Sequence, residues 1–163
     1  MSASTLENVG DELASGVASV ITADGSSSPF PAYGPRNAEK MALNRIEVRG
    51  GGFYRASDQM ALNPSGAYFY NHRRGILSLT VVSQRHNLSA IGPDSAHGVA
   101  IGRCRFLVSR MAQRLTQQTV GGYDVLDVVD LGDVYDFDQK TQTDRTELRF
   151  QIDVAIPGTN YTT

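Results

Sequence analysis

The chain has 163 residues, 40% hydrophobic and 20% charged, which is ordinary for a globular protein and suits one domain, residues 1–163. No apolar run approaches the ~18 residues of a membrane span, and the first twenty residues carry acids in place of a basic region, so neither an anchor nor an export signal is expected. A net charge of -2 lacks the basic footprint of a nucleic-acid-binding domain. One cysteine, Cys104, excludes an internal disulfide and a cysteine-rich metal site.

The first half of the chain predicts a helix, a strand and an excursion. Ser4–Glu7 has the pattern of a capping box, and an amphipathic helix follows to about Ile21. Asn44–Arg49 alternates as a short strand, which the Gly50–Gly52 run ends. Residues 50–74 then combine glycines, a turn signal and five aromatic residues, and this pattern predicts a projecting hairpin or loop.

The second half predicts three strands and one helix. Ile76–Ser83 is a buried strand, and a helix is expected from about Ser95 to Thr116, with Cys104 on its apolar stripe. Tyr123–Leu131 is expected to be a strand, and Gly132–Asp144 an acidic connection. The final strand, Arg145–Ile156, has the clearest alternation, with its hydrophobic residues at even positions: Leu148, Phe150, Ile152, Val154 and Ile156.

This order of elements predicts an α+β fold. We expect about four strands in a mostly antiparallel sheet, with both helices packed on one face and the excursion at about residues 50–74 projecting from the body. Phe150 and Ile152 are expected to be buried between the sheet and the helices.

The sequence lacks the motifs that bind phosphates, metals or cofactors. The Gly50–Gly52 run does not open a helix, and no G-x-x-x-x-G-K-[ST] is present. The histidines His72, His86 and His97 are scattered without zinc-ligand spacing, so structural or solvent roles are expected for them. The acids between Asp133 and Asp144 lack the glycine and the glutamate of a calcium loop. We expect no cofactor, no metal and no catalytic residue, although a Ser-His-Asp triad is spatial and leaves no sequence motif.

Charge is segregated along the chain. Residues 61–119 carry seven arginines and one acid, whereas residues 120–163 carry nine acids and three bases. Four of the arginines lie off the apolar stripe of the second helix, where the absence of interleaved aromatic residues favours solvent or protein contact over nucleic acid. Either these faces are solvated, or a basic surface on one copy meets an acidic surface on the next.

The order of the segments resembles a known family. From about Asn44 to Pro157 it is similar to the tail terminator (tail completion) proteins of long-tailed bacteriophages. The residues that carry the resemblance are, in order, Asn44–Val48, Gly75–Arg85, His97 on the helix with Arg103 and Arg105, Tyr123–Val128 and Arg145–Val154.

The resemblance implies a structural virion protein and no enzyme. Such proteins form rings, typically hexamers, that cap the head-proximal end of the tail tube, stop its growth and present a surface to the head connector. The implied partners are further copies of the chain, the tail tube protein and the head–tail connector protein, with DNA passing through the channel without specific binding. The implied location is the neck of the virion, assembled in the host cytoplasm.

A ring needs a head-to-tail interface between two different patches of one subunit. In the first candidate, arginines of the second helix approach acids of the next subunit: Arg103, Arg105, Arg110 and Arg114 with Asp133, Asp136 and Asp138. In the second, the excursion reaches a neighbour or the tail tube through Tyr68, Phe69 and Tyr70, next to Arg73 and Arg74. The competing interpretations place the acids on the channel wall and fold the excursion onto its own domain.

Two other functions remain open. Another head–tail joining or head-closure protein would have a similar composition and the same partners. A small hydrolase would instead show a concave pocket that holds His72 or His86 beside a carboxylate.

Overall fold

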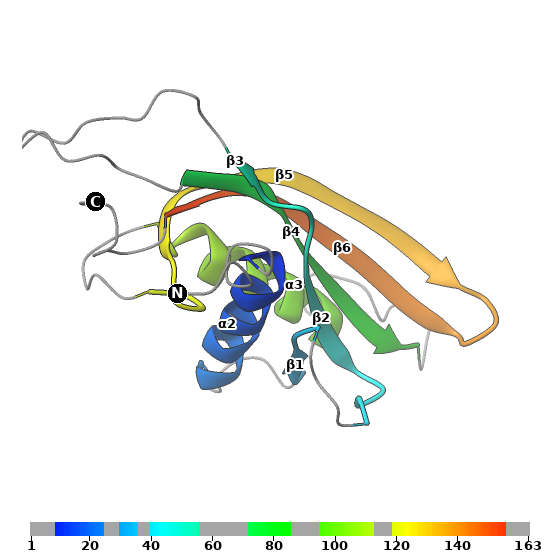
Figure 1. Ribbon diagram of the computed structural model, residues 1–163. Helices are drawn as coiled ribbons and strands as arrows, with labels where there is room; N and C mark the ends of the chain where they lie inside the picture. The colour runs from blue at the N-terminus through cyan, green and yellow to red at the C-terminus, as the bar shows by residue number, and fades with distance from the viewer. Residues whose placement is uncertain are drawn as a thin grey trace, which may run out of the picture.

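In the part of the chain that the structure describes, one mixed sheet carries two helices on one of its faces (Figure 1). The computed structural model describes residues 9–24, 30–35, 40–55, 72–85, 95–112 and 119–155. The predicted α+β fold is confirmed within these ranges. The sheet has six strands in place of about four, because two strands of two residues each join the four that the sequence predicts.

The sheet has the strand order β1-β2-β4-β6-β5, with β3 paired to the start of β4. Every pair is antiparallel except β1 with β2. The edges of this order are β1 and β5, which therefore lie on opposite sides of the sheet. In chain order the elements are α2 (Val9–Ala23), β1 (Ala32–Tyr33), β2 (Arg45–Gly50), β3 (Tyr54–Arg55), β4 (His72–Gln84), α3 (Ala96–Ser109), β5 (Asp124–Asp138) and β6 (Thr143–Ala155).

The hydrophobic core lies between the sheet and the helices. Phe150 and Ile152 of β6 are fully buried, as the alternation predicts, and Leu77 of β4 is the cross-strand partner of Phe150. On the helix side, Leu13 and Val17 of α2 belong to the same buried cluster. The even-numbered residues of β6 thus face the helices and the odd-numbered residues face away from them.

Helix α2 packs closely against the segment that leads into β5. A Cβ atom on Gly16 would lie 2.3 Å from the backbone nitrogen of Gly121, which itself has a φ of +62°. Both positions therefore require glycine, one for the close approach and the other for its left-handed backbone. Next to this contact, the Tyr123 hydroxyl donates a hydrogen bond of 3.2 Å to Glu12.

Helix α3 begins at a capped N-terminus and ends earlier than predicted. The Ser95 hydroxyl accepts a hydrogen bond of 3.0 Å from the backbone N–H of Gly98. Cys104 is buried on the core side, and burial raises the pKa of its thiol to about 12, so it behaves as the small hydrophobe that was expected. The helix stops at Ser109 rather than Thr116. The backbone N–H of Met111 donates to the Val108 carbonyl three residues earlier, the bond of a 3₁₀ turn, and this tighter turn ends the helix.

The acidic connection predicted for Gly132–Asp144 is wrong. Strand β5 continues to Asp138, and a short turn joins it to β6 at Thr143. Its pairing with β6 shifts register between Val125 and Asp127 and again between Asp130 and Asp133. These irregularities remove the period of two that identifies a strand from sequence. The resulting long β5–β6 hairpin runs past the ends of the helices in Figure 1.

The predicted excursion at residues 50–74 is described only at its two ends. Tyr54 in β3 pairs with Arg74 in β4, so the chain leaves and re-enters the sheet at neighbouring positions. Gly75 provides the space for Phe53, because a Cβ atom there would lie 2.4 Å from the Phe53 ring. Residues 56–71 lie outside the described residues, as do Ser4–Glu7 and Ile156.

Candidate assembly surface

Strand β5 is a long sheet edge with exposed hydrophobic side chains. Within the described residues it pairs with β6 on one side and with no strand on the other. An uncovered edge of this kind offers unpaired backbone groups to another chain. Five large hydrophobic side chains are exposed along it: Leu126 (41%), Val129 (41%), Leu131 (51%), Val134 (58%) and Tyr135 (44%). Contiguous exposed apolar residues mark interaction sites more often than scattered ones.

The same strand is acidic. Residues 124–138 contain six aspartates and no basic residue. Cross-strand partners share a face of the sheet, so Asp127 opposite Asp153 and Asp136 opposite Arg145 lie on the face without helices. Asp138 accepts hydrogen bonds from the backbone N–H groups of Lys140 (2.9 Å) and Thr141 (3.4 Å) in the turn, and these bonds lower its pKa. We call strand β5 the acidic edge.

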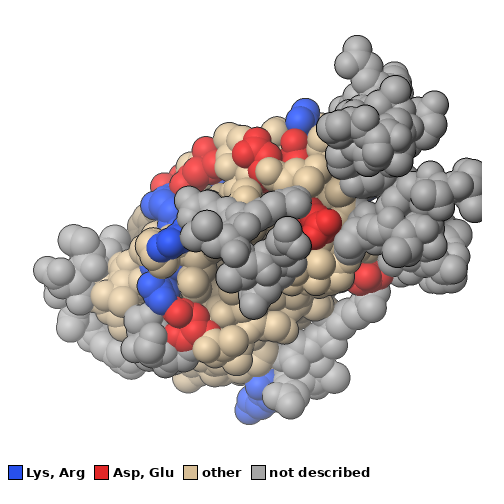
Figure 2. All heavy atoms as spheres, turned by 90° about the vertical axis from the view of Figure 1, so that its left-hand side faces the viewer, with Lys and Arg blue, Asp and Glu red and all other residues tan. Residues whose placement is uncertain are grey.

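Two further aspartates of β5 are paired within the subunit. Asp130 and Asp133 lie on the helix side of the sheet, where Arg105 of α3 contacts them at 2.8 and 3.2 Å. Arg103 of the same helix forms a two-bond fork with Asp24. Seen from the left-hand side of Figure 1, basic and acidic side chains accordingly lie next to one another (Figure 2). The segregation along the sequence is thus partly cancelled in the fold.

The other residues expected at an interface are dispersed. Arg110 lies over the Phe106 ring at 4.8 Å, and Arg73 donates a hydrogen bond of 3.5 Å to the His72 carbonyl. Arg74 holds the carboxylate of Asp153 with bonds of 2.7 and 2.9 Å. Burial would raise the pKa of Asp153, but the Arg74 fork outweighs it and the net shift is downward. Four expected residues lie outside the described part of the chain: Tyr68, Phe69, Tyr70 and Arg114.

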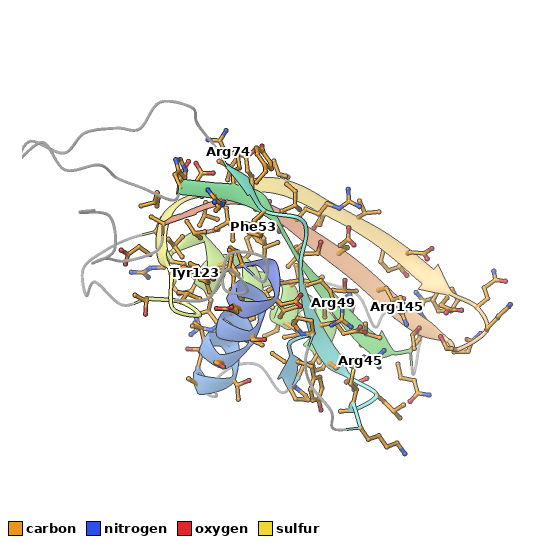
Figure 3. The ribbon with its side chains drawn as sticks, viewed as in Figure 1. Arg45, Arg49, Phe53, Arg74, Tyr123 and Arg145 are labelled. Carbon is orange, nitrogen blue, oxygen red and sulfur yellow. The ribbon has the colours of Figure 1, made fainter. Side chains whose placement is uncertain are left out.

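The face of the sheet without helices carries a repeated charge pattern that our sequence analysis missed. Strands β2 and β6 both read Arg-x-Glu-x-Arg, at residues 45–49 and 145–149, and both flank β4 (Figure 3). Strands β2 and β6 pair with β4 in the same register, so identical residues lie on both sides of Thr80 and its neighbours. The matched pairs are Arg45 and Arg145, Glu47 and Glu147, and Arg49 and Arg149. The repetition is visible in the sequence, but it becomes a pattern only once the strands are aligned.

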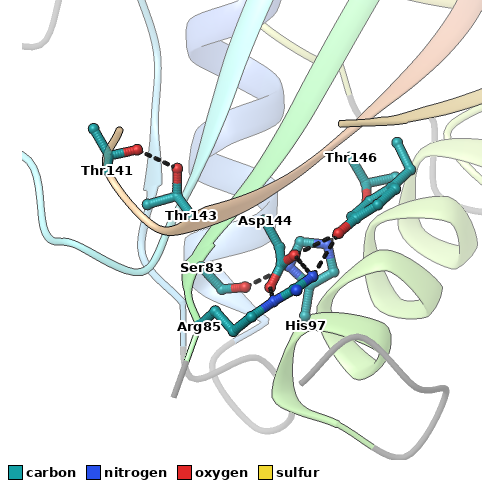
Figure 4. A network of polar contacts seen from close by, with 8 residues as sticks. Ser83, Arg85, His97, Thr141, Thr143, Asp144 and Thr146 are labelled. Atoms are coloured by element: carbon teal, nitrogen blue, oxygen red, sulfur yellow. Dashed lines mark hydrogen bonds and ion pairs between the residues drawn. The ribbon is translucent and has the colours of Figure 1, made fainter. Parts of the chain in front are cut away.

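A buried polar network fixes the turn end of the β5–β6 hairpin (Figure 4). His97 of α3 lies 2.6 Å from the Ser83 hydroxyl of β4 and 2.9 Å from the Thr146 hydroxyl of β6. Burial lowers the pKa of His97, although the nearby Asp144 carboxylate opposes this effect. The network thus ties three elements together with a neutral imidazole.

Asp144 extends the network to the hairpin itself. This carboxylate is fully buried and accepts hydrogen bonds from Arg85 (2.5 and 3.2 Å) and from the Tyr135 hydroxyl (2.6 Å). Burial by itself would raise the pKa of Asp144, but these donors lower it overall. Arg85 also stacks at 4.1 Å on the Phe137 ring of β5. The acidic edge is therefore held in place at its turn end.

These polar groups do not form an open catalytic site. Ser83 and His97 are within hydrogen-bond distance, but both are buried and the third partner is the Thr146 hydroxyl rather than a carboxylate. His72 lies 3.4 Å from Asp153, whose oxygens already bind an arginine. His86 lies outside the described residues.

A cavity of about 190 Å³ lies elsewhere, between the start of α2 and the loop that follows β2. Its lining, Val9–Asp11 and Gly50–Phe53, has Asp11 as its one ionisable side chain. Within the described ranges, no three potential ligands among His, Cys, Asp and Glu gather at a metal site, and neither helix could cross a membrane. The surface best suited to an interaction is therefore the acidic edge.

Comparisons with known proteins gave similarity to solved structures but none at the level of sequence. No family model matches the sequence, and no curated protein is significantly similar to it. Among solved structures, a chain from the "virion of native gene transfer agent (GTA) particle" is similar with a TM-score of 0.49 and 11% sequence identity. The alignment covers 85% of this chain and 84% of that chain.

Proposed function

We propose that the chain is a structural virion protein that assembles into a ring through the edges of its sheet and caps a phage tail tube. The observation that carries this proposal is the set of five exposed hydrophobic side chains on β5, a long edge whose outer side pairs with no strand within the described residues. An isolated subunit would leave that edge in water, where it invites uncontrolled pairing. A second copy would cover both the apolar side chains and the unpaired backbone groups.

The topology favours a ring over a closed dimer. A contact that joins β5 of one copy to the β1 and β2 side of the next uses two different surfaces of the same subunit. Such a head-to-tail contact repeats by rotation, so it closes into a ring when the angle permits. The buried network around Asp144 supports this role, because a rigid edge loses little conformational freedom when a neighbour binds.

The resemblance to tail terminator proteins supplies the biological setting. The ring, which we expect to be a hexamer, would sit at the neck of the virion between the tail tube protein and the head–tail connector protein. It would end tube growth without catalysing a reaction, and DNA would pass through its channel without specific binding. Assembly would take place in the host cytoplasm.

Native mass spectrometry and electron microscopy of the purified protein test this proposal. The expected result is a single ring-sized oligomer with a central channel. Replacing Leu131 and Val134 by glutamate should convert it to monomers, because both exposed side chains would leave the interface with buried charge. Ile76→Glu is the matched control, since Ile76 is 37% exposed on the central strand β4. The assay uses a protein concentration of tens of micromolar. Wild-type protein that stays monomeric at this concentration would overturn the proposal.

A further inference from the structure

We infer that, in the proposed ring, the acidic edge of one copy docks against a basic edge formed by β2 of the next copy. The inference rests on the proposed function and specifies which surfaces of the subunit meet. We define the basic edge as residues 40–50, which contain Lys40, Arg45 and Arg49 against one acid, Glu47.

The acidic and basic edges lie on opposite sides of the sheet. Strand β5 ends the strand order on one side, and β2 ends it on the other, apart from β1. β1 covers little of that side, because it spans two residues and pairs only with Ile46 and Glu47. One subunit therefore presents opposite charge at its two ends, as a head-to-tail contact between identical copies requires.

The charged side chains of the two edges also share a face. Arg45 and Arg49 point to the face without helices, because they alternate along β2 with Ile46 and Val48, which are fully buried on the helix side. Both arginines contact Glu47 of their own strand, at 2.9 and 3.8 Å. Asp127 and Asp136 lie on the same face at the other edge. When two subunits meet edge to edge with their sheets continuing around a ring, these arginines and aspartates are brought together on one surface (Figure 3 shows Arg45 and Arg49).

Exposed hydrophobic side chains accompany the charges at both edges. Leu43, just before β2, is 68% exposed, and Leu131 and Val134 are exposed on β5. Apolar contact between them would supply most of the affinity, since exposed ion pairs contribute little and mainly set the association rate and the choice of partner. The charges would thus ensure that β5 meets β2 of a neighbour and not another β5.

The geometry argues against the arginines of α3 as the partner of β5 in the next copy. Arg105 already binds Asp130 and Asp133 of its own subunit, so α3 and β5 lie on the same side of the molecule. A contact between copies that used these groups would first have to break the pairing within the subunit.

Charge reversal on each edge, separately and in a mixture, tests the inference. The basic-edge variant carries Lys40→Glu and Arg49→Glu, and the acidic-edge variant carries Asp127→Lys and Asp136→Lys. Each variant alone should lose at least about tenfold of its ring fraction in light scattering, because the reversed side chains then meet side chains of the same sign on the neighbouring copy. An equimolar mixture should form rings again, with the two variants alternating, which native mass spectrometry detects as equal numbers of each subunit.

Arg149→Glu provides the matched control. Arg149 lies in the same cross-strand row as Arg49 and is 55% exposed, but it belongs to the interior strand β6. This variant should assemble like the wild type, and circular dichroism should show that every variant is folded.

The outcomes separate this inference from the proposed function. If rings persist in both edge variants, or if the mixture fails to assemble although each variant is folded, the pairing of these edges is wrong while the ring itself stands. If the Arg149→Glu control also loses its rings, the effect is not specific to the edges and the inference is again overturned. A wild-type protein that forms no ring would instead contradict the proposed function.

Discussion

Truncation of Phe150 to alanine should destabilise the fold more than any other single change to the described part of β6. Phe150 is fully buried on the helix side of the sheet, opposite Leu77 of β4. Loss of the ring removes its transfer free energy and leaves a cavity, which together cost about 3–5 kcal/mol for buried phenylalanines. Because β6 pairs with β4 on one side and β5 on the other, its backbone cannot easily shift to fill the space. We therefore expect the upper half of that range.

Urea unfolding followed by circular dichroism measures this loss, at several protein concentrations so that assembly does not contribute. Domains of this kind have about 5–15 kcal/mol of stability, so the midpoint should fall sharply. Phe106→Ala is the matched control, because Phe106 is 46% exposed and mainly contacts Arg103 and Arg110. It should cost less than about 1 kcal/mol. An unchanged midpoint in Phe150→Ala would show that the position or the register of β6 is wrong.

Three further predictions concern charge, pH and the excursion. Asp153→Asn should lower the unfolding free energy by about 1–3 kcal/mol, because it weakens the nearly buried two-bond ion pair with Arg74. Arg149→Gln, at an exposed pair, should cost under about 1 kcal/mol, and urea unfolding measures both. Burial lowers the pKa of His97, so the unfolded chain takes up a proton at a higher pH than the folded chain, and stability should fall as the pH drops below about 6.5 and level off below the folded-state pKa of His97. A second loss should begin near the ordinary pKa of aspartate and continue down through the lowered folded-state pKa of Asp144, and thermal melts across pH would show both steps. Deleting residues 55–70 should leave the circular dichroism of the monomer intact and abolish assembly; a deletion variant that still forms rings would refute the expected role of the excursion.

The sheet core could be predicted from the sequence because alternation is a local signal. Leu148 to Val154 on β6 and Leu77 to Val81 on β4 alternate without interruption, and the structure buries the predicted sides. The same reasoning failed in β5, where the shifts after Val125 and after Asp130 put successive hydrophobic residues out of phase. A bulge is set by the partner strand, so a single strand's pattern cannot reveal it.

The charge pairs could not be predicted because they join distant parts of the chain. Arg103 with Asp24, and Arg74 with Asp153, are each separated by 79 positions. A count of charges along the sequence therefore indicated two segregated surfaces, whereas folding places several of the opposite charges side by side. The cross-subunit role expected for the arginines of α3 stays a prediction, and the pairing of Arg105 within its own subunit favours β2 as the alternative.

The helix-free face of the sheet explains why assembly should proceed through edges and not through faces. On that face Glu47 pairs with Arg45 at 2.9 Å and with Arg49 at 3.8 Å, and Glu147 pairs with Arg149. Each carboxylate thus has its partner on its own strand, and the face is polar enough to remain in water without a cover. The described face therefore has little to gain from a partner, apart from its borders at β2 and β5. At β5, exposed hydrophobic side chains and unpaired backbone groups coincide, so burial against a neighbour stabilises the edge far more than it would stabilise the centre of the sheet.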